Sequence, residues 1–101
     1  MANANEEVFT ICYDNIPVVI SIKDKSLFCQ SLYLATAGAY PDGINSFDNV
    51  IYYIEYVKNR LALDNRFTMS HQKRGELMVK YKKCIEVRDK LILLKNQGEI
   101  E

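Results

Sequence analysis

Two arginines and a tyrosine recur at intervals of seven residues in the C-terminal part of the sequence, at Arg74, Tyr81 and Arg88. On one helix this spacing keeps the three side chains within about 40 degrees of one another, inside an apolar stripe. Arginine binds carboxylates and phosphates through paired N–H donors, so the pattern favours recognition of an acidic partner or a phosphate. The structural alternative is that the arginine stems cover apolar surface while the guanidinium groups pair with Glu55 or Asp48.

A second candidate surface lies on the reverse side of a predicted helix and carries two tyrosines and a leucine. Tyrosine suits a protein interface because it buries a large ring and keeps a hydroxyl for hydrogen bonding. The alternative is that another helix or the N-terminal hairpin of the same chain covers these rings. The predicted partner-binding residues on the two surfaces are Tyr52, Tyr56, Leu63, Arg74, Tyr81 and Arg88.

Residues that catalyse reactions or hold metal ions form no recognisable group in the sequence. His71 is the only histidine, and no cysteine or second histidine stands at the spacing of a metal ligand. The four glycines are isolated, so no phosphate-binding loop or dinucleotide fingerprint is present. We therefore expect a protein that is not an enzyme and needs no cofactor or metal. The three cysteines, Cys12, Cys29 and Cys84, are widely spaced, which is typical of a reducing compartment and predicts a cytoplasmic protein.

The elements that position these residues begin with a predicted β-hairpin over residues 8–22. It turns at Asp14 and Asn15, two residue types that tolerate the positive φ of a tight turn. Pro17 has no N–H, which favours an edge position for its strand or a ladder that begins just beyond it. The predicted pairs are Tyr13 with Ile16, Ile11 with Val18 and Phe9 with Ile20 on an apolar face, and Val8 with Ser21, Thr10 with Val19 and Cys12 with Pro17 on the other.

Three helices are predicted after the hairpin. The first is capped by Asp24 or Ser26 and ends near residue 39, before the turn sequence YPDG. The second is capped by Ser46 and ends near residues 63–65, and its core-facing stripe consists of Phe47, Val50, Ile51, Ile54, Val57 and Leu61. The third opens at Ser70, runs to residue 95 or 96, and spans roughly 39 Å, longer than a compact domain of this size needs.

The predicted fold is therefore α+β, with an N-terminal β-hairpin packed on a three-helix bundle whose last helix is long. Gly75 is unusual inside this last helix, because a helical glycine costs about 1 kcal/mol against alanine. It indicates either a close contact between helices or a later start of the helix. The 101 residues suit a single domain, 1–101, and we expect residues 1–7 and 97–101 to be flexible.

Charge is balanced over the whole chain but divided unevenly along it. Thirteen basic and thirteen acidic residues cancel, which argues against bulk attraction to nucleic acid or anionic lipid. Residues 1–57 hold seven acids and two bases, and residues 58–101 hold six acids and eleven bases, so the parts carry about minus five and plus five. They attract each other within one fold or across a head-to-tail pair, or else the basic C-terminal helix binds an acidic partner.

The start of the sequence, MANANEEVF, lacks the basic and apolar regions of a signal peptide, and no apolar run approaches the length of a membrane helix. No membrane partner is expected from these features.

The stretch ICYDNIPVVISIKDKSLFCQSLYLATAGAY resembles the order of strand, turn, strand, Lys-Asp and helix at the start of viral and phage antirepressor domains of the BRO type. It covers less than a third of the chain. The aromatic-valine-alanine run that this family places before Lys23 and Asp24 is replaced here by Val-Ile-Ser-Ile. The resemblance implies a DNA-binding or phage-regulatory alternative.

Taken together, these observations predict a small cytoplasmic adaptor, inhibitor or regulatory subunit that contacts another protein or a second copy of itself, as a homodimer. The alternative is a nucleic-acid-binding regulator that uses the basic C-terminal helix.

Overall fold

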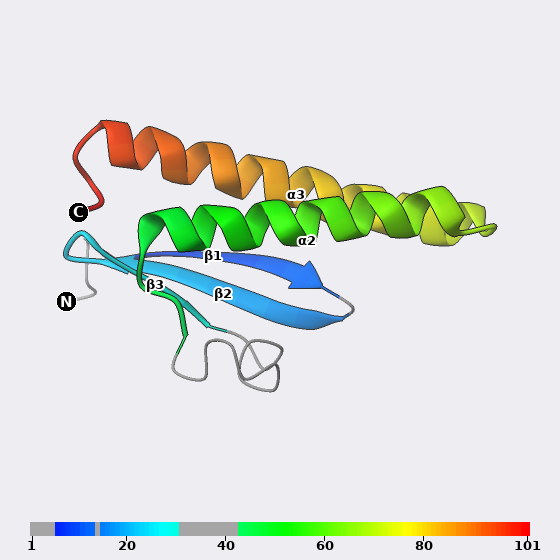
Figure 1. Ribbon diagram of the computed structural model, residues 1–101, viewed down its shortest axis with the longest axis horizontal. Helices are drawn as coiled ribbons and strands as arrows, with labels where there is room; N and C mark the ends of the chain where they lie inside the picture. Colours follow the sequence, from blue (N-terminus) through cyan, green and yellow to red (C-terminus); the bar gives the residue numbers. More distant parts are fainter. Residues whose placement is uncertain (1–5, 14, 31–42) are drawn as a thin grey trace.

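A computed structural model of the protein describes residues 6–13, 15–30 and 43–101. These residues form a three-stranded antiparallel sheet in the order β1-β2-β3, followed by a pair of helices (Figure 1). The strands are β1 Glu6–Tyr13, β2 Ile16–Lys23 and β3 Ser26–Gln30, and the helices are α2 Phe47–Phe67 and α3 His71–Asn96. The predicted α+β class is confirmed.

The hairpin of β1 and β2 has the register expected from the sequence, with all of the predicted cross-strand pairs present. Alternation explains it, because Ile11, Val18 and Ile20 are buried on one face while Val19 is exposed on the other. Pro17 lies in the central strand of the sheet rather than at an edge. Among the described residues its missing N–H costs no ladder bond to β3, because the pairs between β2 and β3 that the structure describes run from Val19 to Lys23.

The segment expected to begin the first helix is strand β3, so the described residues do not support the predicted three-helix bundle. The described residues hold two helices and a third strand. Asp24 and Lys25 have φ of 52° and 68°, which makes them the two-residue turn of a second hairpin instead of a helix cap. In β3, Leu27 and Cys29 are buried and the residues between and beside them are exposed, a strand period of two. Residues 31–39 of the expected helix lie outside the described residues.

The two helices begin where the sequence predicted. Ser46 precedes α2 in extended conformation without a side-chain cap, and α2 continues to Phe67, beyond the predicted end. Ser70 caps α3, because its Oγ accepts a hydrogen bond of 3.2 Å from the backbone N–H of Lys73. Gly98, with φ of 77°, follows the end of α3 at Asn96 and the C-cap residue Gln97.

Gly75 lies in the second turn of α3, and a methyl group added there would meet nothing within 4 Å. Both explanations taken from the sequence, a close contact between helices and a later helix start, are therefore wrong. This glycine has no packing role in the described part of the chain.

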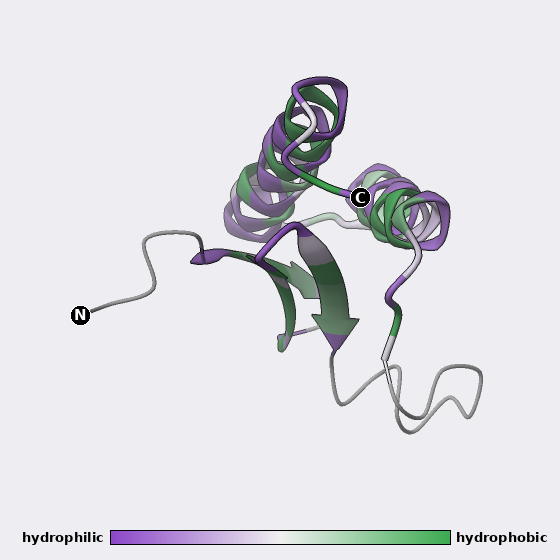
Figure 2. Ribbon diagram, turned by 90° about the vertical axis from the view of Figure 1, so that its left-hand side faces the viewer, coloured by the Kyte–Doolittle hydropathy of each residue, from purple (hydrophilic) through white to green (hydrophobic). Residues whose placement is uncertain are grey.

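Both helices lie on the same face of the sheet, so the described residues form two layers (Figure 2). The hydrophobic core consists of residues from the strands and from both helices. Figure 1 also shows α2 and α3 extending past the turn between β1 and β2, so that the sheet does not support their far ends. Phe67 and Met69 at this end are 75% and 94% exposed. The side chains buried to less than 2% exposure are Ile11, Val18, Ile20, Cys29, Val50, Ile54, Val57, Leu61, Cys84, Val87 and Leu91.

The residues after α3 turn back toward the sheet. Ile100 is buried, and the backbone N–H of Glu101 donates a hydrogen bond of 3.0 Å to the carbonyl oxygen of Lys25. The structure thus gives the end of the chain contacts that a freely moving segment would lack. The mobility expected for residues 97–101 stays a prediction.

Candidate functional site

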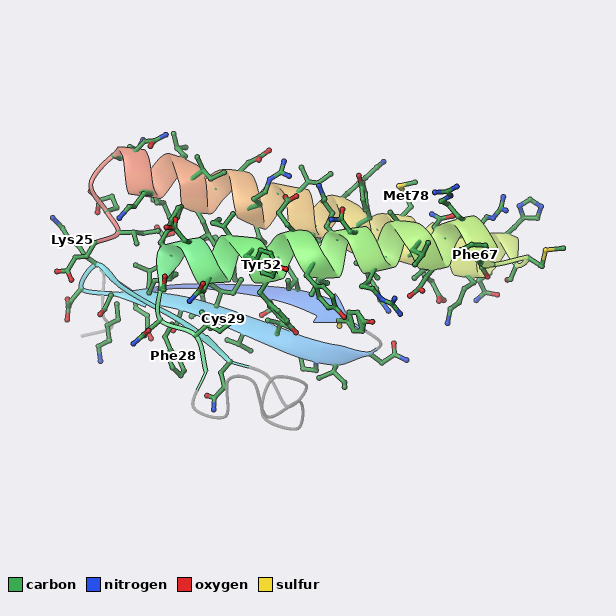
Figure 3. All side chains as sticks on the ribbon, viewed as in Figure 1. Lys25, Phe28, Cys29, Tyr52, Phe67 and Met78 are labelled. Atoms are coloured by element: carbon green, nitrogen blue, oxygen red, sulfur yellow. The ribbon has the colours of Figure 1, made fainter. Side chains whose placement is uncertain are left out.

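The tyrosine face, which we define as Tyr52, Tyr56 and Leu63, lies along one side of α2. The three side chains recur at helical spacing and are 74%, 39% and 38% exposed. They line an open depression of about 320 Å³ together with Glu55, Asn59 and Arg60. Figure 3 shows Tyr52 in front of α2 rather than between the helix and the sheet. The structure therefore brings three of the six predicted partner-binding residues into one surface.

Stacked rings hold one side of this surface in place. Tyr56 stacks on Tyr13 of β1 at a centroid distance of 6.4 Å and on Tyr53 of α2 at 6.3 Å, with interplanar angles of 16° and 20°. The hairpin therefore covers part of Tyr56, as the alternative from the sequence required. It leaves Tyr52 and Leu63 exposed.

Arg60 places a positive charge at the rim of the depression. Its Nε donates a hydrogen bond of 3.2 Å to the hydroxyl of Tyr13, which orients the guanidinium beside the tyrosine face. The sequence analysis missed both Arg60 and Tyr13. Arg60 follows Tyr56 by one helical turn, and this spacing alone could have placed it on the same side of the helix as Tyr56. The contact with Tyr13 depends on how the sheet packs on α2, and sequence patterns within a single element do not predict that packing.

Arg88 of α3 reaches across to α2 and forms an ion pair with Glu55, which also lines the depression. Arg88 Nη1 donates to Glu55 Oε1, and Lys58 Nζ lies 3.0 Å from Glu55 Oε2. The hydrogen bond from Arg88 is the main reason why the pKa of Glu55 lies below its ordinary value. This is the structural alternative that the sequence offered for Arg88, with Glu55 as the partner instead of Asp48. A role of Arg88 in binding stays a prediction.

Arg74 and Tyr81 do not line the depression. Arg74 is exposed in the first turns of α3, where its Nε donates a hydrogen bond of 3.1 Å to the carbonyl oxygen of Thr68. Tyr81 is half-buried against the hydrophobic core. The seven-residue spacing therefore places Arg74, Tyr81 and Arg88 on one side of α3 but in three different surroundings.

Two of the cysteines are buried, and the histidine is exposed. Burial raises the pKa of Cys29 to about 12 and that of Cys84 to about 11, so both are thiols at neutral pH instead of nucleophilic thiolates. His71 is exposed at the first position of α3. Among the placed residues, no three His, Cys, Asp or Glu side chains gather as metal ligands would. Neither helix of the described part is long and apolar enough to cross a membrane.

Comparisons with known proteins give no information on function, so the proposal below is based on the surfaces described above. No protein-family model matches the chain, and neither the curated proteins nor the solved structures gave a match.

Proposed function

We propose that the protein is a small, non-enzymatic binding protein of the cytoplasm that acts through protein–protein contacts, as an adaptor, inhibitor or regulatory subunit, and works as a homodimer. The observation that supports this most is the tyrosine face. Tyr52 leaves 74% of its surface in water on a helix whose other side is anchored in the core. Exposed apolar patches rimmed by polar residues are typical of binding sites.

The residues of the tyrosine face indicate what kind of partner surface would bind to it. The depression accepts an apolar or aromatic side chain between Tyr52 and Leu63, and Arg60 offers a positive charge for a carboxylate beside it. Glu55 would not repel that carboxylate strongly, because Arg88 and Lys58 already pair with it. A stable interface needs about 800 Å² from each partner. The depression alone is smaller than this, so the proposed contact also includes the part of α2 that leads to Phe67.

A matched pair of variants tests the proposal. Tyr52→Ser with Leu63→Ser removes the apolar part of the tyrosine face, and both side chains are exposed, so the fold should persist. Leu93→Ser is the control, because Leu93 is 48% exposed on α3, away from the tyrosine face. In affinity capture from the native cell, the double variant should lose a partner that wild type and Leu93→Ser retain.

Circular dichroism spectra should show all three proteins folded. If the double variant captures the same proteins as wild type in the same amounts, the tyrosine face is not the binding site and the proposal fails.

The nucleic-acid alternative is supported by the lysines of α3. Lys80, Lys82 and Lys83 border one depression, and a groove lined with cations attracts phosphates. The alternative predicts retention on duplex DNA or on RNA that falls steeply as salt increases. An electrophoretic mobility assay at low salt decides it, because an absence of retention there rejects nucleic-acid binding.

A further inference from the structure

Strand β1 leaves one long edge of the sheet open, since it pairs only with β2 among the described residues. Exposed edges are usually protected by lysine, proline or a bulge. β1 contains no lysine, proline or bulge over Glu6–Tyr13, its register with β2 is continuous, and its two charged residues, Glu6 and Glu7, stand only at its N-terminal end. The opposite edge, β3, is shorter and is bridged by Ile44, whose backbone exchanges two hydrogen bonds of 2.7 Å with Cys29.

The register shows which backbone groups of β1 point outward. Tyr13 and Ile16 flank a two-residue turn, so they form a hydrogen-bonded pair, and such pairs alternate along an antiparallel ladder. The N–H and C=O groups of Phe9 and Ile11 therefore bond to β2. The outward groups are those of Glu6, Val8, Thr10 and Cys12.

Lysines of α3 stand beside the C-terminal half of this edge. A depression of about 430 Å³ between Thr10 and Cys12 of β1 and the outer side of α3 is bordered by Lys80, Lys82 and Lys83. Lys80 Nζ donates a hydrogen bond of 3.2 Å to Asn15 Oδ1, which keeps its charge near the edge. Glu86 is the one acid on this border, and its carboxylate lies 3.8 Å from Lys83. A strand added here would gain from carrying acidic residues.

We propose that two copies of the chain pair in antiparallel fashion through β1, so that Glu7 of each copy, on the sheet face that the helices cover, lies beside the partner's Lys82 and the partner's Lys83. The two sheets then join into one. This inference rests on the proposed function, in which the protein acts through protein contacts as a homodimer.

A two-fold axis at Phe9 satisfies both the hydrogen bonds and the charges of this arrangement. It sets Val8 opposite the partner's Thr10 and Glu6 opposite the partner's Cys12, so outward groups meet outward groups. Parallel pairing would put the glutamates of the two copies side by side, where like charges repel. The pairing brings an acid from the acidic first part of one chain beside lysines from the basic second part of the other.

Charge reversal tests the proposal in the full-length protein. One variant carries Glu7→Lys, and the other carries Lys82→Glu and Lys83→Glu. Each alone should weaken self-association by at least about tenfold, because repulsion replaces attraction at two symmetry-related contacts. Mixing the two variants, or combining all three substitutions in one chain, should restore the dimer, since the reversed acid then faces the reversed lysines. Sedimentation equilibrium measures the dissociation constants.

A second pair of variants tests the backbone part of the proposal. Thr10→Pro removes an outward N–H and is compatible with an edge strand, whereas Thr10→Val keeps that N–H. Thr10→Pro should be a folded monomer, and Thr10→Val should remain a dimer.

The proposal is overturned if wild type is a monomer, if both charge-reversed variants dimerise like wild type, or if the mixture fails to restore association. It is also overturned if Tyr52→Ser with Leu63→Ser abolishes the dimer, since the tyrosine face would then be the self-association surface. Failure of the proposed function looks different, because partner capture would be unaffected by that double variant while the dimer persisted.

Discussion

Replacing Gly43 with alanine should destabilise the fold strongly. Gly43 has φ of 91°, and an added methyl would lie 2.7 Å from Phe28 Cζ and 2.8 Å from the carbonyl oxygen of Cys29. The ring of Phe28 is 38% exposed and can move aside. The carbonyl of Cys29 cannot, because it accepts a hydrogen bond of 2.7 Å from the N–H of Ile44.

The expected loss follows from these two effects. A side chain at positive φ costs about 1–2 kcal/mol, and overpacking costs about 1–3 kcal/mol, so the free energy of unfolding should fall by about 2–5 kcal/mol. That is a large part of the stability of a small domain, which is typically about 5–15 kcal/mol.

Gly98 and Gly75 are the controls, because alanine meets nothing within 4 Å at either position. Gly98 has φ of 77°, so Gly98→Ala should cost only the conformational part, about 1–2 kcal/mol. Gly75 lies in regular helix, so Gly75→Ala should raise the free energy of unfolding by about 1 kcal/mol.

Urea denaturation followed by circular dichroism, at one fixed protein concentration, measures all three variants. The reasoning is refuted if the free energy of unfolding of Gly43→Ala lies within about 0.5 kcal/mol of the wild-type value, or if Gly75→Ala is less stable than wild type.

Three further predictions concern the ion pair, the thiols and the end of the chain. Glu55→Gln should lower the free energy of unfolding at neutral pH by less than about 1 kcal/mol, because Glu55 and Arg88 are partly exposed. Folding lowers the pKa of Glu55, so its contribution is present above the ordinary value of 4.5 and is lost as pH falls below it; a difference from wild type that is independent of pH in urea titrations would contradict this. Mass spectrometry after limited alkylation should find Cys12 modified before Cys29 and Cys84, whose thiols are buried with pKa values of about 12 and 11, and equal rates would refute it. Ile100→Ala should lower the free energy of unfolding by about 2 kcal/mol, whereas no change would support the mobile segment expected from the sequence.

The parts of the fold that local pattern determines were predictable. The register of β1 and β2 follows from the two-residue turn and the alternation of Ile11, Val18 and Ile20, and the start of α3 follows from the cap at Ser70. Strand β3 was missed because its five residues are also compatible with a helix, and the turn at Asp24 and Lys25 lacks the glycine that usually marks such hairpins.

The candidate site was predictable only where it depends on one helix. Helical spacing placed Tyr52, Tyr56 and Leu63 on one side of α2, and the structure keeps them there. The contacts of Tyr13 with Tyr56 and Arg60 join residues more than forty positions apart, so they depend on how the sheet meets the helix. The open edge of β1 likewise became evident only from the order of the strands.

Site-specific photocrosslinking in the native cell tests the central claim, that the protein acts through the tyrosine face, most directly. A photoreactive side chain would replace Tyr52 in one protein and Leu93 in the control, since both positions are exposed and lie on different helices. We predict that the probe at position 52 gives a discrete adduct with another protein and that the probe at position 93 does not. Equal labelling from both positions, or no protein adduct from position 52, would contradict the account.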